Sequence, residues 1–229
     1  MQRSLVGSEM CIRDSINIGT LNKNTIPSMF LAGKKANELG HIVLLDPVGA
    51  GASRLRTDTA NRLMQEVRFD AVRGNISEIK TLCTGSGSTK GVDADAVDAV
   101  TEANLDDGVA LVKAFAKQTG CIIAVTGAID LVSDGERCWC IRNGRAEMSR
   151  ITGTGCQLSA LMTAFLVANP DHKLAAAAAA VCMMGLAGEI GWANMQPGDG
   201  NSTYRNRIID AIFNMTGDAL EEGAKYELR

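Results

Sequence analysis

Short apolar runs alternate with amphipathic stretches along most of the chain. Nearly continuous apolar runs predict buried strands, and apolar residues recurring every three or four positions predict helices. A first strand is expected to begin at Ile16. Further strands are expected at residues 41–45, 69–72 and 121–125, and helices at residues 26–39, 57–67 and 105–119. This alternation predicts a three-layer α/β fold, with a mostly parallel central sheet flanked by helices on both faces.

The last part of the chain has a different pattern. Residues 131–144 predict a hairpin, because Gly135 and the Asn143-Gly144 pair are turn signals. Apolar or amphipathic helices follow at residues 156–168, 174–192 and 204–222. We expect residues 16–229 to form a single domain, since 229 residues favour one large domain over two.

A glycine-punctuated turn at residues 150–155 leads directly into the apolar helix 156–168. Gly153 and Gly155 let the backbone turn sharply and approach a ligand closely. The helix then offers unpaired N–H groups and the positive end of its dipole, which together suit a phosphate. Cys156 lies at the start of this helix, and a helix N-terminus favours the thiolate. The alternative is an ordinary glycine-rich turn before a core helix.

Two more strand ends carry candidate chemistry. Asp46 ends the strand 41–45 and is followed by a glycine-rich loop, which is where open α/β sheets bind ligands. Its simpler interpretation is a cap before Pro47. After the next strand, Arg73 could meet phosphate while Glu78 helps to hold a hydrated Mg²⁺. The alternative is structural, because Asn75 and Glu78 have nearly the spacing of a capping box.

Composition limits the function classes. A net charge of −3 and the lack of any lysine–arginine cluster argue against nucleic acid as a partner. The alanine-rich uncharged run at residues 174–188 is too short to cross a bilayer, so no membrane role is expected. Seven scattered cysteines without a Cys-x-x-Cys pair argue against a disulfide framework or a zinc site. We therefore expect a reduced, cytoplasmic setting.

The common nucleotide-binding motifs fail. Residues 85–90 lack the glycine that must precede the lysine of a Walker loop, and neither Gly49-x-Gly51 nor Gly153-x-Gly155 continues into the dinucleotide pattern. The only histidines, His41 and His172, do not lie in catalytic-looking turns.

The first residues differ from the rest. Residues 1–15 show no clear period, and residues 5–15 resemble a peptide often produced when sequencing-adapter DNA is translated. We expect residues 1–15 to be non-native, the alternative being a genuine N-terminal extension.

Four segments together resemble the hydroxyethylthiazole kinase family of thiamine salvage, within the ribokinase-like fold. They are residues 17–21, 46–52 and 73–79, and Val125-Thr126-Gly127 together with residues 152–156. Their order and approximate spacing match from Ile16 nearly to the end of the chain. The sharpest sign is Cys156 after Gly153-Thr154-Gly155, because most ribokinase-like relatives have aspartate there.

The resemblance implies ATP- and Mg²⁺-dependent phosphorylation of 4-methyl-5-(2-hydroxyethyl)thiazole. It also implies residue roles. Arg73 and Thr126 would contact ATP, and Asp46 and Glu78 would organise Mg²⁺ through waters. Gly153 would contact the thiazole, Gly153, Thr154, Gly155 and Cys156 would form an anion hole, and Cys156 would be the candidate base.

The chain departs from the family at its beginning. Members normally start with a further strand–helix–strand portion that supplies a methionine over the thiazole, and they assemble as homotrimers with sites between subunits. Residues 1–15 stand where that portion would be, so an exposed sheet edge, a changed pocket and weaker assembly are expected. Two alternatives remain open: a related kinase of hydroxymethylpyrimidine or a dehydratase of damaged nicotinamide nucleotides, and an inactive, truncated binding fragment.

Overall fold

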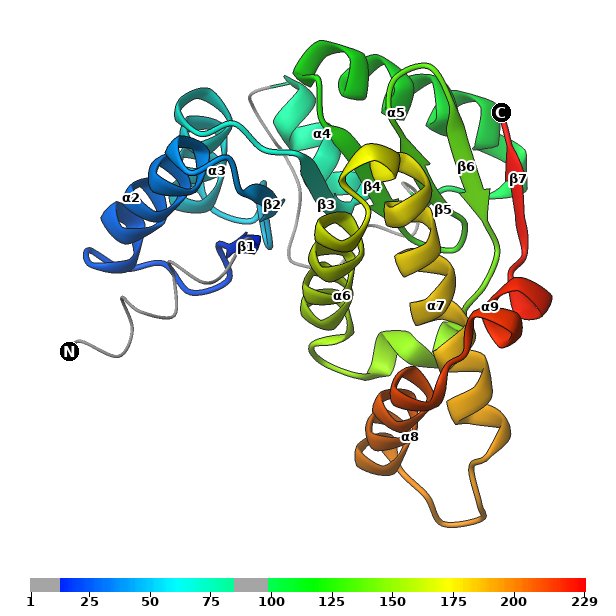
Figure 1. Ribbon diagram of the computed structural model, residues 1–229. Helices are drawn as coiled ribbons and strands as arrows, with labels where there is room; N and C mark the ends of the chain where they lie inside the picture. Colours follow the sequence, from blue (N-terminus) through cyan, green and yellow to red (C-terminus); the bar gives the residue numbers. More distant parts are fainter. Residues whose placement is uncertain (1–12, 85–98) are drawn as a thin grey trace.

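A seven-stranded sheet forms the centre of the molecule in the computed structural model, which describes residues 13–84 and 99–229 (Figure 1). The strands lie in sequence order, with β1–β4 parallel and β5–β7 added antiparallel. They are β1 (Arg13–Asn17), β2 (Ile42–Asp46), β3 (Ala71–Asn75), β4 (Ile122–Thr126), β5 (Asp130–Ser133), β6 (Cys138–Ile141) and β7 (Tyr226–Leu228). The predicted three-layer α/β fold with a mostly parallel sheet is confirmed, but the sheet is mixed, because the β5–β6 hairpin and β7 add antiparallel strands.

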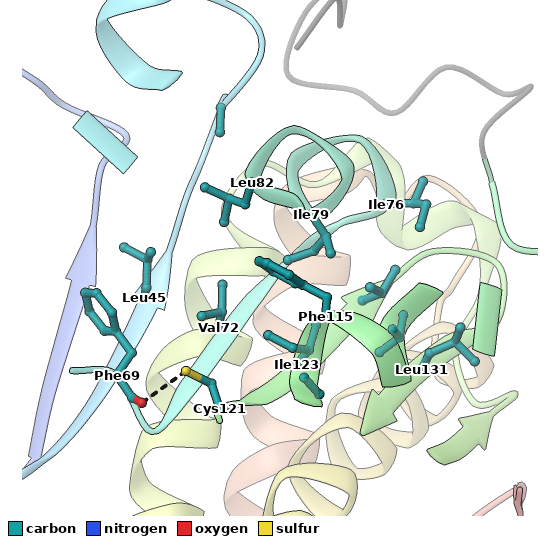
Figure 2. Close-up of a cluster of buried hydrophobic side chains, with 14 of the residues drawn as sticks. Leu45, Phe69, Val72, Ile76, Ile79, Leu82, Phe115, Cys121, Ile123 and Leu131 are labelled. Carbon is teal, nitrogen blue, oxygen red and sulfur yellow. Dashed lines mark hydrogen bonds between the residues drawn. The ribbon is translucent and has the colours of Figure 1, made fainter. Parts of the chain in front are cut away.

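Four helices cover one face of the sheet. They are α2 (Thr25–Glu38), α3 (Arg54–Glu66), α4 (Ile76–Thr84) and α5 (Leu105–Thr119). Alternate strand residues such as Val43 and Leu45 point into this layer, as the pleat requires. Figure 2 shows Phe115 of α5 and Ile79 of α4 packed over Val72 and Ile123 of the sheet. This apolar layer packs the helices against the parallel strands.

The other face is covered by α6 (Thr154–Ala168) and α7 (Lys173–Ala193), with α8 (Asn201–Asn214) packed on α7. Ile42 and Leu44 face this side. The stretch Pro170–Ala193 is long and apolar enough to cross a membrane by length and composition alone, with a mean hydropathy of 1.7. In the fold 72% of its apolar window is buried, as expected for a core helix of an α/β domain.

Local signals explain most helix ends. Gly120 ends α5 with a left-handed φ of 69°. The expected start of α3 at Thr57 is wrong: Ser53 caps it by accepting a hydrogen bond from the Arg56 N–H, and α3 begins at Arg54. Thr57 instead lies within the first turn, where its Oγ1 accepts a hydrogen bond from Gly51 N.

The chain's end also differs from expectation. Residues 204–222 do not form one helix, because the chain leaves α8 after Asn214 and Thr216 caps a new helix, α9 (Gly217–Gly223). A last strand, β7, then pairs with β6 and forms one edge of the sheet. The sequence pattern gives no sign of this three-residue strand, because its pairing partner lies far away in the chain.

The opposite edge is β1, which pairs in parallel with β2 from Arg13 to Asn17. It therefore includes the last three residues of the segment 1–15, and Asp14 Oδ2 lies 3.1 Å from His41 Nδ1. The non-native origin of residues 1–15 stays a prediction, and residues 1–12 lie outside the described part of the chain.

Candidate active site

The candidate residues converge where the parallel strands end. Asn17, Asp46, Asn75 and Thr126 are the last residues of β1, β2, β3 and β4. Parallel neighbouring strands bring their carboxyl ends to one edge of a sheet, which is the usual ligand-binding edge of α/β folds. The N-terminus of α6 lies at the same edge, because Cys156 and Ser159 contact residues of β1 and β2. Segments far apart in the sequence thus meet at one point.

Asp46 is the most buried of the charged residues here, with no exposed surface. Its Oδ2 accepts hydrogen bonds from Asn17 Nδ2 at 2.9 Å and from Ser159 Oγ at 2.8 Å. Its Oδ1 lies 3.6 Å from Arg73 Nη1 and has no hydrogen-bond partner among the described residues. A buried carboxylate oxygen without a partner is costly unless a ligand or ion satisfies it. The simple cap interpretation of Asp46 is therefore insufficient.

Arg73 stands between Asp46 and β4. Its Nη2 donates to Thr126 Oγ1 at 2.8 Å, and its guanidinium lies against the backbone of Gly155. A β-carbon at Gly155 would stand only 2.7 Å from Arg73 Nη1. Gly155 is thus required for a close approach between the helix N-terminus and the arginine, and positive charge is concentrated where the turn opens.

Glu78 has a structural role that the spacing anticipates. Its Oε2 accepts from Asn75 N and Asn75 Oδ1 accepts from Glu78 N, both at 2.8 Å, which is a reciprocal capping box. Its Oε1 accepts from Gly49 N at 2.8 Å. Burial raises the pKa of Glu78, while the N–H groups of Gly49 and Asn75 work against that rise. The carboxylate therefore ties the loop after β2 to the end of β3.

The turn before α6 has the conformation that its glycines allow. Gly153 has a φ of 98°, a left-handed conformation that favours glycine, and α6 begins at Thr154. Gln157 N is the first helix N–H to find a partner within the turn, donating to Gly153 O at 3.0 Å. Cys156 is exposed in this first turn, and its Sγ accepts a hydrogen bond from Asn17 Nδ2 at 3.3 Å.

Sequence reasoning misses three residues of this site. Asn17 and Ser159 both donate to Asp46, and Arg56 donates from Nη2 to Gly19 O at 3.1 Å beside Gly49. The expected start of the first strand at Ile16 is wrong, because β1 ends at Asn17, and this error hid the position of Asn17 at the site. Ser159 looks like a helix-core position, and nothing in its spacing points to Asp46.

Asp130 is a further charged group near this edge. Its Oδ1 accepts from Gly127 N at 2.8 Å and so fixes the turn that follows Thr126. Burial raises the pKa of Asp130 to about 7, although the Gly127 N–H and the charge of Arg73 oppose the rise.

A three-layer α/β fold whose parallel strands bring a buried carboxylate and an arginine to a glycine-lined helix N-terminus is the architecture of ribokinase-like small-molecule kinases. Solved kinase structures share this fold, among them a Staphylococcus aureus pyridoxal kinase in complex with AMP-PCP and pyridoxal. That structure has a TM-score of 0.56 at 15% identity, over 99% of this chain and 77% of the other.

Within that class, the chain belongs to the hydroxyethylthiazole kinase family, whose model matches residues 12–218. It is 53% identical to the hydroxyethylthiazole kinase of Clostridium acetobutylicum, over 96% of this chain and 81% of that protein. It is 46% identical to that of Clostridium beijerinckii, over 93% of this chain and 75% of that protein. The hydroxyethylthiazole kinase structure from Pyrococcus horikoshii OT3 has a TM-score of 0.84 at 28% identity, covering 100% of this chain and 81% of that one.

The family membership confirms the expectation of a phosphotransferase. A kinase family implies ATP as the co-substrate and a small molecule as the acceptor, and this family implies a place in thiamine salvage.

Proposed function

We propose that this chain transfers the γ-phosphoryl group of ATP to the hydroxyl of 4-methyl-5-(2-hydroxyethyl)thiazole, with Mg²⁺. The observation that carries the proposal is the convergence of Asp46, Arg73 and Cys156 at the N-terminus of α6. Phosphoryl transfer depends on positioning and charge neutralisation more than on covalent chemistry, and these groups supply both.

Arg73 and Thr126 would bind ATP, and the N–H groups of residues 153–156 would form the anion hole for the transferred group. The Arg73–Thr126 hydrogen bond holds the guanidinium beside Gly155, so its charge and the helix N-terminus act on the same phosphate oxygens. Gly153 would contact the thiazole, because its exposed, side-chain-free backbone leaves room for a ring.

The residues present fit Mg²⁺ held mainly by the nucleotide. Asp46 Oδ1 is a buried carboxylate oxygen that lacks a hydrogen-bond partner, and Glu78 retains lone pairs beyond its two backbone contacts. Among the described residues there is no cluster of three or more metal-binding side chains. Such a sparse site suits Mg²⁺, which keeps several waters and binds through one or two carboxylates and substrate phosphates. When bound, the ion neutralises charge on the phosphates.

Cys156 would receive the proton of the substrate hydroxyl at its Sγ as the new O–P bond forms. Its exposure makes the sulfur accessible to an alcohol, and Asn17 fixes its direction. A loose transition state requires little proton removal in advance, so the anion hole contributes more than the base.

The test is phosphorylation of hydroxyethylthiazole by the full chain with ATP and Mg²⁺, detecting the phosphorylated product directly, in wild type and Cys156→Ala. We expect turnover of the variant to fall about 100-fold or more, as for loss of a general base, while the ATP dissociation constant changes less than about twofold. Cys83→Ala, on α4 and half-buried, is the matched control and should keep wild-type turnover. Equal losses of turnover and ATP binding in Cys156→Ala would refute a role in proton transfer.

We further propose a cytoplasmic location and a homotrimer for this chain, on the strength of the family resemblance. Light scattering of the purified chain tests assembly, and a single monomeric species would contradict it. Competition by hydroxymethylpyrimidine tests the related-kinase alternative, which predicts that this alcohol is the preferred substrate.

A further inference from the structure

Asn17, at the end of β1, links Cys156 and Asp46 although it carries no charge. Its Oδ1 accepts a hydrogen bond from Gly19 N at 2.8 Å. Its Nδ2 donates to Asp46 Oδ2 at 2.9 Å and to Cys156 Sγ at 3.3 Å. One half-buried carboxamide thus contacts the backbone of its own loop, the buried carboxylate of β2 and the exposed sulfur of α6.

The chemistry of its neighbours fixes the direction of this amide. A backbone N–H can only donate, so the atom of Asn17 that faces Gly19 N must be the carbonyl oxygen. The NH₂ group then faces Asp46 and Cys156, and its two N–H bonds match these two acceptors. A flipped amide would set N–H against N–H at Gly19 and would leave Asp46 facing an oxygen.

The contacts of Asn17 also determine which oxygen of Asp46 stays free. Asn17 and Ser159 both donate to Oδ2, and this leaves Oδ1 turned toward Arg73 without a hydrogen bond. The same amide holds the Cys156 sulfur on the Asp46 side of the helix mouth. Rotation of either side chain would break a hydrogen bond to Asn17.

We infer that Asn17 is a positioning residue. It holds the Cys156 sulfur and Asp46 Oδ1, the oxygen without a hydrogen bond, at a fixed spacing beside the N-terminus of α6. This inference rests on the proposed function, in which the sulfur receives a proton and the carboxylate organises the ion on the same phosphoryl group. Asn17 acts through these two side chains and needs no contact with substrate. If Asn17 contacted only Gly19 N, its role would be limited to stabilising the turn after β1.

Two substitutions separate these roles. Asn17→Asp keeps an oxygen that can accept from Gly19 N but removes both side-chain donors, whereas Asn17→Ala removes all three hydrogen bonds. Asn22→Ala is the matched control, because Asn22 Oδ1 caps the same loop by accepting from Asn24 N and Thr25 N and has no hydrogen bond to Cys156 or Asp46. Ser159→Ala removes only the second donor to Asp46.

The first measurement is the rate of iodoacetamide alkylation at Cys156 without substrates, followed by mass spectrometry of its peptide. An N–H donor favours thiolate over thiol, so both Asn17 variants should react about tenfold more slowly than wild type, the effect of one hydrogen bond to a charged group. Ser159→Ala and Asn22→Ala should react within about twofold of wild type, since neither hydrogen bond lost reaches the sulfur.

The second measurement is the split between kcat and KM. Both Asn17 variants should lower kcat about 10- to 100-fold with the KM for ATP within about threefold, as expected for loss of positioning at the reacting atoms. Asn22→Ala should keep the wild-type kcat. The inference would be overturned if both Asn17 variants were alkylated at the wild-type rate, or if Asn17→Asp kept the wild-type kcat. Asn17 would then serve only to stabilise the turn at Gly19. Alkylation needs no turnover, so an inactive wild-type chain would refute the proposed function while the positioning of Cys156 is still measured.

Discussion

Substitution of Gly155 by alanine should separate stability from nucleotide binding. The added β-carbon would stand 2.7 Å from Arg73 Nη1 and 2.9 Å from Nη2, both closer than atoms can pack. Gly155 itself lies within α6 and its φ is not positive, so alanine fits the backbone without strain. Since the conflict is with the end of a long side chain, the guanidinium should move rather than the helix.

The size of both effects follows from the contacts. A guanidinium pushed back by about 1 Å to reach normal contact distance can no longer hold its hydrogen bond to Thr126 Oγ1, now 2.8 Å long. The displaced guanidinium also loses its alignment with the phosphates of ATP; a hydrogen bond to a charged group is worth about 1.5–3 kcal/mol, so kcat/KM for ATP should fall about 10- to 100-fold. Alanine in place of glycine favours a helix by up to about 1 kcal/mol, which offsets part of the lost Arg73–Thr126 hydrogen bond, so the melting temperature should change by only a few degrees.

The assay is steady-state kinetics with varied ATP, together with thermal unfolding of the same samples. Gly217→Ala is the control, because Gly217 opens α9, its φ is also not positive, and an added β-carbon there would contact nothing within 4 Å. It should leave both the kinetics and the melting temperature near wild type. An unchanged KM for ATP in Gly155→Ala, or a large loss of stability, would show that the guanidinium does not depend on this glycine.

Three further changes test other parts of the structure. With a folded pKa of about 7 against an ordinary 3.8, Asp130 retains a proton that the unfolded chain loses, so stability falls as pH rises from about 4 to 7. Asp130→Asn should therefore gain about 2 kcal/mol over wild type between pH 5 and pH 8 in denaturant titrations, and a pH-independent difference would contradict this. Asp46→Asn should raise the Mg²⁺ concentration needed for half-maximal rate several-fold. Glu78→Gln sets its NH₂ group against a backbone N–H and should mainly lower the free energy of unfolding, by about 1–3 kcal/mol. The assignment would be refuted if Mg²⁺ titrations showed the larger effect for Glu78→Gln and melting curves the larger effect for Asp46→Asn. Met162→Ala should cost about 2–5 kcal/mol in urea unfolding because the side chain is fully buried, while Leu31→Ala, 71% exposed, should cost less than about 0.5 kcal/mol.

Residues close together in the sequence were the predictable part of this site. Asn75 and Glu78 form the capping box that their spacing indicates, and Gly153 makes the sharp turn expected before the helix, with a left-handed φ. Both arrangements depend on neighbouring backbone groups, which a sequence pattern contains. The buried strands were predictable for the same reason, since a continuous apolar run can be recognised locally.

Contacts between distant segments were not predictable in this way. Ser159 donates to Asp46 across 113 positions of the sequence, and β7 pairs with β6 although helices α6 to α9 lie between them in the chain. Ser159 has the spacing of any helix-core residue, and Tyr226–Leu228 is too short to show a strand period. The roles of Ser159 and β7 depend on the folded structure, because each requires a partner from a distant segment of the chain.

The two carboxylates of the site, Asp46 and Glu78, differ in how many of their oxygens accept hydrogen bonds, and this difference assigns them different roles. Glu78 has both oxygens committed to backbone N–H groups, at Gly49 and Asn75, so moving it toward an ion would loosen the loops that end β2 and β3. Asp46 has both of its donors on one oxygen, and the other is buried, accepts no hydrogen bond and lies 3.6 Å from Arg73 Nη1. An incoming cation would bind that oxygen without breaking a hydrogen bond, and would share it with Arg73. The geometry therefore favours Asp46 as the carboxylate that faces the ion, with Glu78 holding the surrounding loops and reaching the ion only through water.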